Sequence, residues 1–498
     1  MAQSLVSLVD IRKEFAGVRA LDGVSLDIGS GQVCCLVGEN GSGKSTLIKV
    51  LAGVHAPDSG QIVIDGTARE SLTPAESIAA GFQFIYQDFS LLPNLSVAEN
   101  ITFGTRVAGP VRWFSRAKAR QDAAATLDRM RVSIDLDRPT GELPMVDRQL
   151  VAVAAALARD ARLLVMDEPT TALSRREVTV LLEIIDGLRA DGISTLFVSH
   201  KLDEVAAISD HTVVIRNGVK VADQPAGSLD RAALVATMTG REIDFGTHVA
   251  EPVRADAPVV LAVSRAGREG CFEEVDIEVR EGEVFGITGL LGSGRDTLAL
   301  ALFGLLPMTS GKVSVDGAEV TLDSPRAAMA AGIGFVPEDR LSEGLFLDHS
   351  IESNIAVRLV DRLRTRAGLL DRPALRRLAQ EWVTKLSIKT SDVRRAVSTL
   401  SGGNQQRVVL AKWLSAAPRV LVLNGPTVGV DVGSKQEILQ TLRELAAAGM
   451  AVIVISDDVP ELLDVCHRIA LMRDGRIVES YDRASLDERA LNELLVAA

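Results

Sequence analysis

Gly38-Glu39-Asn40-Gly41-Ser42-Gly43-Lys44-Ser45-Thr46 is the stretch that decides the fold, and an altered copy of it follows later in the chain. The copy reads Gly289-Leu290-Leu291-Gly292-Ser293-Gly294-Arg295-Asp296-Thr297, with Arg for Lys and Asp for Ser. The spacing Gly-x4-Gly-Lys-Ser bends the backbone so that successive N–H groups and a helix start face a triphosphate. The sequence therefore predicts two phosphate-binding loops, of which only the first is complete.

In the complete loop, each residue type has a chemical use. Lys44 would reach the terminal phosphates, and the hydroxyl of Ser45 would ligate Mg²⁺. A single match to this pattern can be accidental, but here an apolar strand precedes it and a helical segment follows it. The residues expected to bind nucleotide in this loop are Gly38, Asn40, Gly41, Gly43, Lys44, Ser45 and Thr46.

The two halves of the chain match in one register, which indicates a duplicated domain. The offset between matched residues increases once, by six residues, as if a short insertion lay between Glu338 and Leu400. The stretch Arg241–Pro258 contains Gly246, Pro252 and Pro258 and has little apolar periodicity, so it is interpreted as a linker. We predict a first domain at 1–243, a linker at 244–257 and a second domain at 258–498.

Composition excludes several classes of protein. Hydrophobic residues make up 47% and charged residues 24% of the 498 residues, as in ordinary globular proteins. The net charge of −12 argues against nucleic-acid binding through a broad basic surface. No uncharged apolar run is long enough to span a membrane, and we expect no signal peptide. The four cysteines have no metal-binding spacing, so we expect reduced, buried side chains in a cytosolic protein.

Apolar strands alternate with helical segments in both halves, which predicts an α/β fold. We expect a strand at Gln32–Val37 and a helix from Ser45 to Leu51. Further short strands are expected at Arg162–Met166, Ser194–Val198, Val420–Leu423 and Ala451–Ile455. This alternation predicts mostly parallel sheets with flanking helices and ligands at the carboxyl ends of the strands.

Helical periodicity dominates between Gln87 and Leu143, which predicts a helical insert in the first domain. The matching insert of the second domain contains the arginine-rich stretch Arg362–Arg377. We interpret this stretch as a solvated helix face; contact with acidic lipid or a partner is the alternative.

Two adjacent carboxylates, Asp167 and Glu168, follow the apolar run Leu163–Met166. Such a pair often belongs to an exposed turn, but after a matched phosphate-binding loop it has a catalytic use. A buried strand would deliver Asp167 to the Mg²⁺ shell and Glu168 to the attacking water. As general base, Glu168 would contribute about 10²- to 10⁴-fold to the rate.

Three further candidates have competing structural interpretations. His200 follows the strand at Ser194–Val198 and would contact the γ-phosphate, although a lone histidine after an apolar run is more often structural. Gln87 is expected at the catalytic metal, but an exposed turn glutamine is also common. The ring of Phe15 would stack on the nucleotide base, and packing in the core is nearly as consistent with the sequence.

Leu400-Ser401-Gly402-Gly403-Asn404-Gln405-Gln406 resembles the signature sequence of ATP-binding cassette (ABC) ATPases. A serine and two glycines at a helix start present a hydroxyl and N–H donors to a phosphate. Three further segments and the fused tandem arrangement resemble the ATPases of bacterial monosaccharide importers of the ribose, galactose and xylose type. They are Val336-Pro337-Glu338-Asp339-Arg340, Gly286-Ile287-Thr288-Gly289-Leu290 and Gly429-Val430-Asp431-Val432-Gly433.

The resemblance implies ATP and Mg²⁺ as cofactors and two cassettes, each with a small antiparallel β part and a helical insert. It implies an ATPase coupled to solute import, peripheral on the cytoplasmic face of the plasma membrane. The implied partners are integral-membrane permease subunits, as a dimer, and through them a solute-binding protein outside the membrane, but no nucleic acid. The permease is expected to contact the segment Phe89–Asn100 and its counterpart after Glu338.

In that family each ATP lies between the phosphate-binding loop of one cassette and the signature of the other. The resemblance thus implies one intact composite site, formed by Lys44, Ser45, Gln87, Asp167, Glu168 and His200 with Ser401, Gly402 and Gly403. The altered residues all fall in the other site: Arg295, Asp296, Glu338, Asn424, Gly425 and Asp457, with Leu143–Asp147 at the signature position and Ala266 in place of Phe15. We therefore expect one hydrolysis per closure of the cassette pair.

The alternative is a soluble tandem cassette protein, such as an ABC-F translation factor. Proteins of that class resemble this chain in having two fused cassettes, but they have two intact sites and a long, charged helical linker. The short linker and the single complete phosphate-binding loop favour the importer interpretation.

Overall fold

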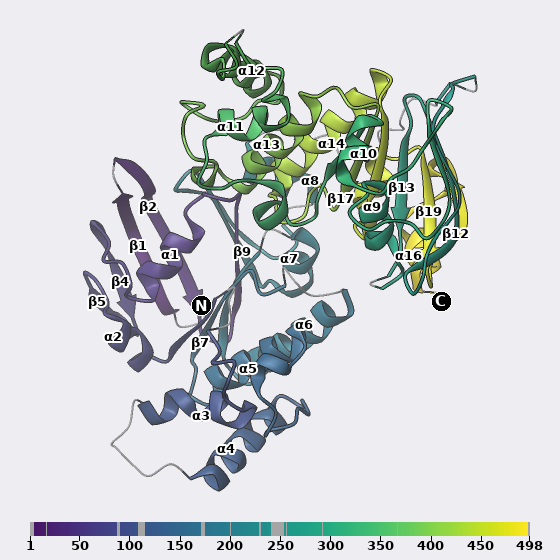
Figure 1. Cartoon of the computed structure of the whole chain (residues 1–498). Coiled ribbons are helices and arrows are strands. Elements are labelled where there is room, and N and C mark those ends of the chain that lie inside the picture. The colour runs from purple at the N-terminus through teal and green to yellow at the C-terminus, as the bar shows by residue number, and fades with distance from the viewer. Residues whose placement is uncertain are drawn as a thin grey trace. The chain divides into compact units, whose positions relative to one another are not determined.

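A computed structural model of the chain describes residues 4–15, 17–86, 90–107, 115–170, 175–199, 201–228, 231–240, 253–254, 256–290, 292–365 and 367–496. The chain divides into two compact units, Met1–Asp244 and Phe245–Ala498. Each unit contains a six-stranded sheet, a four-stranded sheet and flanking helices (Figure 1). The predicted α/β class with two domains of one architecture is confirmed.

The central sheet of the first unit has the strand order β10-β9-β3-β8-β7-β6. Its strands are β3 (Val33–Val37), β6 (Phe82–Ile85), β7 (Leu163–Asp167), β8 (Ser194–Val198), β9 (His211–Arg216) and β10 (Val219–Pro225). All neighbours are parallel except β9 and β10. Every residue of β3 and of β8 is buried, as expected for central strands covered by helices on both faces.

A separate antiparallel sheet of the first unit has the order β2-β1-β4-β5. It consists of β1 (Ser4–Phe15), β2 (Val18–Gly29), β4 (Ser59–Ile64) and β5 (Thr67–Arg69). Both β1 and β4 contain buried as well as exposed positions, and register shifts interrupt strict alternation along β1. This sheet is the small antiparallel part implied by the resemblance.

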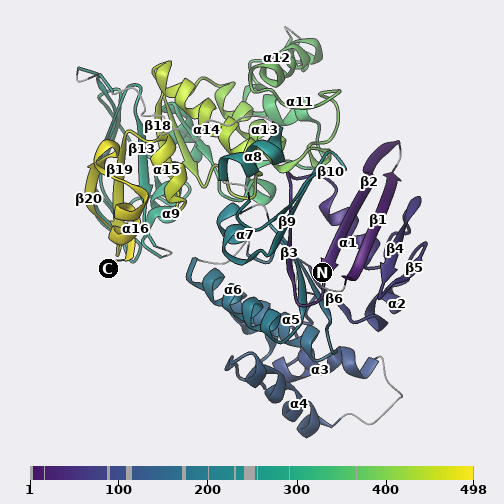
Figure 2. The ribbon, with the colours of Figure 1, turned by 180° about the vertical axis from the view of Figure 1, so that it is seen from behind.

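The helices of the first unit include the expected helical insert. They are α1 (Lys44–Leu51), α2 (Pro74–Ala79), α3 (Val97–Val107), α4 (Arg116–Arg129), α5 (Met145–Leu157), α6 (Arg175–Ala190), α7 (Leu202–Ile208) and α8 (Arg231–Thr239), with a 3₁₀ turn at Thr140–Glu142. Both ribbon views show α3 and α4 side by side below α5, at the lower end of the first unit (Figures 1 and 2).

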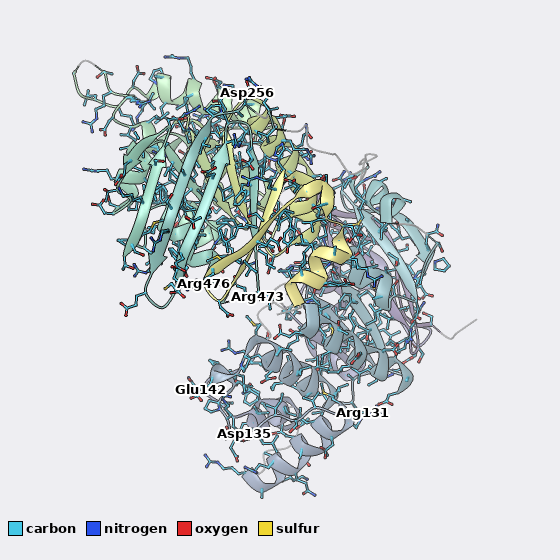
Figure 3. All side chains as sticks on the ribbon, turned by 90° about the vertical axis from the view of Figure 1, so that its right-hand side faces the viewer. Arg131, Asp135, Glu142, Asp256, Arg473 and Arg476 are labelled. Carbon is cyan, nitrogen blue, oxygen red and sulfur yellow. The ribbon has the colours of Figure 1, made fainter. Side chains whose placement is uncertain are left out.

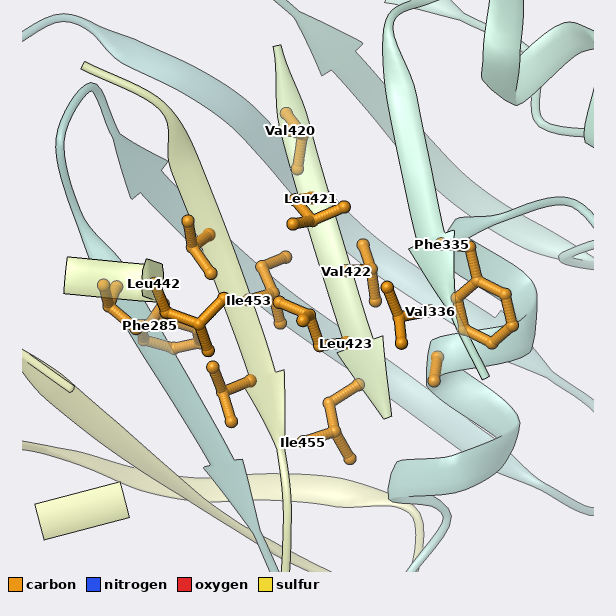
Figure 4. Packing of buried hydrophobic residues seen from close by; sticks show 14 of the residues in the cluster. Phe285, Phe335, Val336, Val420, Leu421, Val422, Leu423, Leu442, Ile453 and Ile455 are labelled. Atoms are coloured by element: carbon orange, nitrogen blue, oxygen red, sulfur yellow. The ribbon is translucent and has the colours of Figure 1, made fainter. Parts of the chain in front are cut away.

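The second unit repeats this plan, with a central sheet ordered β16-β17-β18-β13-β19-β20 and an antiparallel sheet ordered β12-β11-β14-β15. Its strands are β11 (Val259–Arg268), β12 (Phe272–Arg280), β13 (Val284–Thr288), β14 (Ser310–Val315), β15 (Ala318–Val320), β16 (Ile333–Val336), β17 (Val420–Asn424), β18 (Ala451–Ile455), β19 (Arg468–Arg473) and β20 (Arg476–Asp482). Around β17, side chains such as Val422, Leu423 and Ile453 form the apolar centre of the unit (Figure 4).

The helices of the second unit follow in the same order. They are α9 (Arg295–Leu302), α10 (Pro325–Ala330), α11 (Ile351–Ala356), α12 (Arg372–Lys385), α13 (Gly402–Leu414), α14 (Val432–Ala447), α15 (Val459–Val465) and α16 (Glu488–Val496). A five-residue π-turn, η2, spans Arg340–Gly344, and 3₁₀ turns span Val357–Leu359, Val397–Thr399 and Arg483–Ser485.

The expectation of a single insertion between the two copies is wrong. Asn100 accepts a hydrogen bond from the backbone N–H of Leu92, and Asn354 accepts the same bond from Phe346, each at 2.9 Å. Asn100 and Asn354 are therefore equivalent. The difference between their residue numbers is larger than for the residues matched before the expected insertion and smaller than for those matched after it. The second copy gained residues in two places, first in the segment that contains η2 and again between Asn354 and Leu400. The register of the phosphate-binding loops is unaffected.

Charged side chains cover much of the surface, and many form ion pairs there. Arg476, for example, lies at the start of β20 (Figure 3). It is 2.8 Å from Glu273 and 2.6 Å from Glu274. In the arginine-rich stretch, Arg364 and Arg376 pair with Asp361 and Glu352. Such exposed pairs contribute little to stability.

Among the described residues, no helix combines the length and apolar character needed to cross a bilayer. The four cysteines are unpaired, as expected. Cys34, Cys35 and Cys466 are buried, whereas Cys271 is only half-buried.

Candidate functional site

The first phosphate-binding loop connects β3 to α1 at the carboxyl end of a central strand. Its backbone needs glycine at two positions where it approaches other chain segments closely. A Cβ at Gly38 would lie 2.2 Å from the carbonyl oxygen of Ile215, and one at Gly43, whose φ is +109°, would lie 2.5 Å from that of Ala20. The loop is therefore fixed by tertiary contacts, and Asn40 and Gly41 at its tip are exposed.

Lys44 is the first residue of α1, and its side chain is buried inside the loop. Its Nζ donates to the carbonyl oxygens of Gly38 and Glu39 at 2.7 and 2.9 Å. These bonds hold the ammonium group in the concave side of the loop, where the N–H groups of a phosphate-binding loop converge on an anion. Binding of phosphate by this loop stays a prediction.

Ser45 and Asp167 come together although they are far apart in the chain. The hydroxyl of Ser45 lies 3.5 Å from Oδ2 of Asp167, the last residue of β7. Burial raises the pKa of Asp167 above its usual value, and the neighbouring charge of Glu168 raises it further. A bound cation would relieve that cost, and a hydroxyl beside a carboxylate is the oxygen donor set that Mg²⁺ prefers. These two residues therefore fit a magnesium ion.

The strand order brings the other predicted residues to the same edge. Strands β3, β8 and β7 are neighbours and parallel, so their carboxyl ends lie side by side. Glu168 follows β7 directly, and its N–H donates to the carbonyl oxygen of Val198, the last residue of β8. Glu168 has a φ of +50°, an uncommon conformation for a non-glycine residue that the surrounding contacts must maintain.

Two predicted residues, Gln87 and His200, lie outside the described part of the chain. Their roles remain predictions. Phe15 lies at the end of β1 and is 41% exposed. Among the described residues, its ring contacts the ring of His55 edge-on and the ammonium group of Lys13. The core-packing interpretation of Phe15 is therefore wrong, whereas its counterpart Ala266 is fully buried.

The second phosphate-binding loop contains an internal cation with its own anionic partners. Arg295 donates to the carbonyl oxygen of Gly289 at 2.9 Å, the position that Lys44 occupies in the first loop. Its guanidinium also lies 3.4 Å from Asp457 and 3.7 Å from Asp296. Burial raises the pKa of Glu338 above its usual value, and the negative charge of Asp296 raises it further. Two carboxylates therefore lie within 4 Å of the guanidinium, and a third, that of Glu338, interacts with it electrostatically.

The residues that follow β17 lack the chemistry of those that follow β7. Asn424 ends β17 as Asp167 ends β7, and Gly425, with a φ of +56°, has a left-handed backbone like that of Glu168. The backbone of the second unit thus keeps the conformation of the first without the carboxylate. A Cβ at Gly425 would lie 2.8 Å from a methyl group of Val428, so even the restored side chain would be crowded.

The signature segment forms the start of α13. Ser401 is the N-cap residue, and its hydroxyl accepts a 2.8 Å hydrogen bond from Asn404. Gly402 and Gly403 are the first residues of the helix, so backbone N–H groups are left for an anion. A Cβ at Gly403 would lie 2.1 Å from the hydroxyl oxygen of Ser434, so glycine is required there. The equivalent helix α5 of the first unit begins after Pro144, which has neither hydroxyl nor N–H.

Sequence reasoning missed the role of Arg340 at the start of η2. Its guanidinium donates to the carbonyl oxygens of Val428 and Gly429 at 2.7 and 3.0 Å. A Cβ at Gly402 would lie 2.7 Å from Nη2 of Arg340, so the guanidinium packs directly against the signature. Nothing in the spacing of these segments indicates that they meet.

Sequence reasoning also missed two buried carboxylates behind these loops, Glu204 and Glu461. Glu461 accepts hydrogen bonds from Thr427 at 2.7 Å and Ser456 at 3.3 Å, while its Oε1 is buried without a hydrogen-bond partner among the residues that the structure describes. Burial raises the pKa of Glu461 to about 7. A signal was available, because Thr170, Ser199 and Glu204 recur as Thr427, Ser456 and Glu461 in the altered half.

We predict that Glu461→Gln will flatten the pH dependence of stability. The folded pKa lies above the ordinary value of 4.5, so the folded chain retains a proton that the unfolded chain has lost. The resulting stabilisation is complete below the unfolded pKa and is lost as the pH rises through about 7. Gln cannot ionise, so the variant should unfold at a higher temperature than wild type at about pH 8, with the difference shrinking towards about pH 5.

Thermal unfolding followed by circular dichroism over that pH range tests this prediction. Wild type in the same buffers is the control, since the other titrating groups are shared. Parallel curves for the two proteins would contradict it.

Comparison with known proteins gives one consistent result. The profile of the ABC transporter family matches residues 21–171 and 272–428. The ribose import ATP-binding protein RbsA 2 of Streptomyces avermitilis is 44% identical over 490 residues, which are 98% of this chain and 96% of the relative. A putative ribose/galactose/methyl galactoside import ATP-binding protein of Agrobacterium fabrum is 38% identical over 493 residues, with 99% and 98% covered.

Among solved structures, the complex of archaeal ribosomal stalk protein aP1 and the ribosome recycling factor aABCE1 contains a similar chain. The TM-score is 0.63 at 22% identity, and the match covers 98% of this chain and 92% of that one. At this identity the likeness supports the tandem fold alone.

Proposed function

Since the chain belongs to the ABC transporter family, we propose that it is the ATP-hydrolysing subunit of a bacterial importer for a simple sugar or a related small polar solute. The observation that carries this proposal is the meeting of Lys44, Ser45 and Asp167 at one sheet edge, in a chain that matches import ATP-binding proteins over its whole length. The relatives are import proteins, which favours this function over that of a translation factor.

In the proposed site, the first unit supplies most of the chemistry. Lys44 and the N–H groups of residues 38–46 bind the phosphates, with Gly38, Asn40, Gly41, Gly43 and Thr46 forming the cradle. Ser45, Asp167 and Gln87 hold Mg²⁺, which neutralises charge on the phosphates when bound. Glu168 orients and deprotonates the attacking water, and His200 contacts the γ-phosphate. The exposed ring of Phe15 stacks on adenine.

We propose that the signature residues of the second unit also contact nucleotide phosphate. Ser401, Gly402 and Gly403 present a hydroxyl and N–H groups at the start of α13, and Arg340 supports that helix start. The equivalent residues of the other site cannot do the same chemistry. Asn424 and Gly425 replace the metal ligand and the base, and Asp296 and Asp457 add negative charge where the phosphates and their metal would lie. We propose that hydrolysis occurs at the first site alone.

We propose that the chain works at the cytoplasmic face of the plasma membrane with a permease, as a dimer, and a solute-binding protein. The helical inserts of both units expose apolar side chains at equivalent positions, Leu92 at 41% and Phe346 at 55%. Single exposed apolar residues are common, but the repetition of this one at matched positions supports a shared docking role. Both residues lie in the segments expected to contact the permease.

Co-purification tests the importer assignment. The chain is tagged in its native cell, the membranes are solubilised gently, and the associated proteins are identified. We expect a polytopic permease and, with it, a solute-binding protein whose sugar can then be screened. As a matched control, Leu92→Glu combined with Phe346→Glu should lose the permease while retaining ATP binding. Recovery of ribosomes, or of no membrane protein, would contradict the assignment.

A further inference from the structure

A buried network in the first unit joins the two loops that carry the proposed base and the proposed γ-phosphate contact. At its centre is Glu204 in the first turn of α7, whose side chain is almost fully buried. Its Oε2 accepts hydrogen bonds from Thr170 at 2.7 Å and from Ser199 at 3.0 Å. Both hydroxyl donors are themselves buried. One carboxylate oxygen therefore ties together two segments that are distant in sequence.

Lys201 completes the network from the other side. Its Nζ lies 3.4 Å from Oε1 of Glu204 and donates to the carbonyl oxygen of Thr170 at 2.8 Å. The backbone N–H of Lys201 also donates to the hydroxyl of Ser199 at 3.0 Å. The buried carboxylate of Glu204 is thus contacted by two hydroxyl donors and one ammonium group, which satisfy its hydrogen-bonding needs inside the protein.

The residues of this network lie next to the proposed base and the proposed γ-phosphate contact in the sequence. Thr170 comes two residues after Glu168, and Ser199 and Lys201 are the neighbours of His200 on either side. The backbone bond from Glu168 to Val198 joins the same two loops at the level of the strands. A shift of either loop would have to break bonds that Glu204 holds. The unusual φ of Glu168 also requires such support from its surroundings.

The altered half offers an internal comparison. Thr427, Ser456 and Glu461 repeat the hydroxyl bonds, but Asp458 replaces Lys201 and pairs with Lys435 instead. The second unit has Gly425 and Asp457 in place of Glu168 and His200, yet it retains the two hydroxyl bonds. These hydroxyl bonds therefore have a structural role that does not depend on catalysis. The ionic part, Lys201 with Glu204, occurs in the half that keeps the complete loop.

We propose that Glu204 is a positioning residue for ATP hydrolysis. It holds the loop after β7 and the loop after β8 in one arrangement, so that the base and the γ-phosphate contact act on the same phosphate. This inference rests on the proposed function. It assigns to Glu204 no contact with nucleotide, so its loss should slow turnover and leave ATP binding intact.

The test compares Glu204→Gln with Glu461→Gln in the purified transporter complex. Steady-state ATPase assays give kcat and KM, and a fluorescent ATP analogue gives the affinity. For Glu204→Gln we expect kcat to fall about tenfold or more. Removing a residue that orients a ligand, or displacing a reacting group by about 1 Å, commonly has an effect of this size. The KM for ATP and the analogue affinity should stay within about twofold. Glu461→Gln should keep kcat within about twofold of wild type.

A second variant keeps the test decisive if Glu204→Gln does not fold. Lys201 is partly exposed, so Lys201→Met removes the ionic bonds and leaves the two hydroxyl bonds in place. It should lower kcat without changing the affinity for the analogue. An unchanged kcat in either variant, or an equal fall in Glu204→Gln and Glu461→Gln, would overturn the proposal. Failure of the wild-type complex to hydrolyse ATP would instead refute the proposed function.

Discussion

Glu168→Gln is expected to reduce the ATPase activity of the assembled complex by about 10²- to 10⁴-fold, the contribution of a positioned general base. The amide keeps the size of the side chain and can adopt the same backbone conformation, but it cannot take a proton from water. Because the second unit has Gly425 at the equivalent position, it offers no matching carboxylate there that could compensate. ATP binding should persist, since Lys44 and its loop are untouched.

The measurement is turnover of wild-type and variant complexes under the same conditions. Activity above about a tenth of wild type would contradict hydrolysis at a single site. The reverse substitution is the matched control. Gly425→Glu should restore little, because Asn424 and Pro144 remain and a Cβ at this position is crowded by Val428.

Lys44→Met is expected to abolish both hydrolysis and tight ATP binding, whereas Arg295→Met should leave turnover within about twofold of wild type. Methionine preserves the apolar stem of each side chain and removes the charge. In the first loop that charge is held at the phosphate cradle by two carbonyl oxygens, and its loss should cost about 10²-fold or more. In the second loop the charge is already balanced by Asp457 and Asp296.

Binding of a fluorescent ATP analogue and ATPase turnover distinguish the two variants. Both substitutions remove a buried cation from the same position of a duplicated loop, so a general effect on folding should appear in both. If Arg295→Met were as inactive as Lys44→Met, the second site would be required for turnover. The proposed division between the two sites would then be wrong.

Much of the fold follows from short-range patterns. The apolar strands before Gly38 and after Arg162 lie within a residue of their predicted bounds, because a fully buried strand must be apolar throughout. The phosphate-binding loop was predictable because its glycines, lysine and serine lie at fixed spacing within one contiguous segment. The division of the insertion into two parts was missed, although Ser96 and Asn100 recur at the same spacing as Ser350 and Asn354. The matching side-chain bonds of Asn100 and Asn354 establish that register.

The sequence by itself determined the duplication, the complete and altered phosphate-binding loops, and the adjacent carboxylates, since each lies within one contiguous segment. Only the tertiary structure decided that Phe15 is exposed, that Arg295 is paired with Asp457, that Arg340 packs on the signature and that Glu204 joins two loops. The physical reason is the order of the strands. Parallel strands that are neighbours in the sheet bring their carboxyl ends together regardless of their separation in the chain, and no local pattern specifies which side chains then meet.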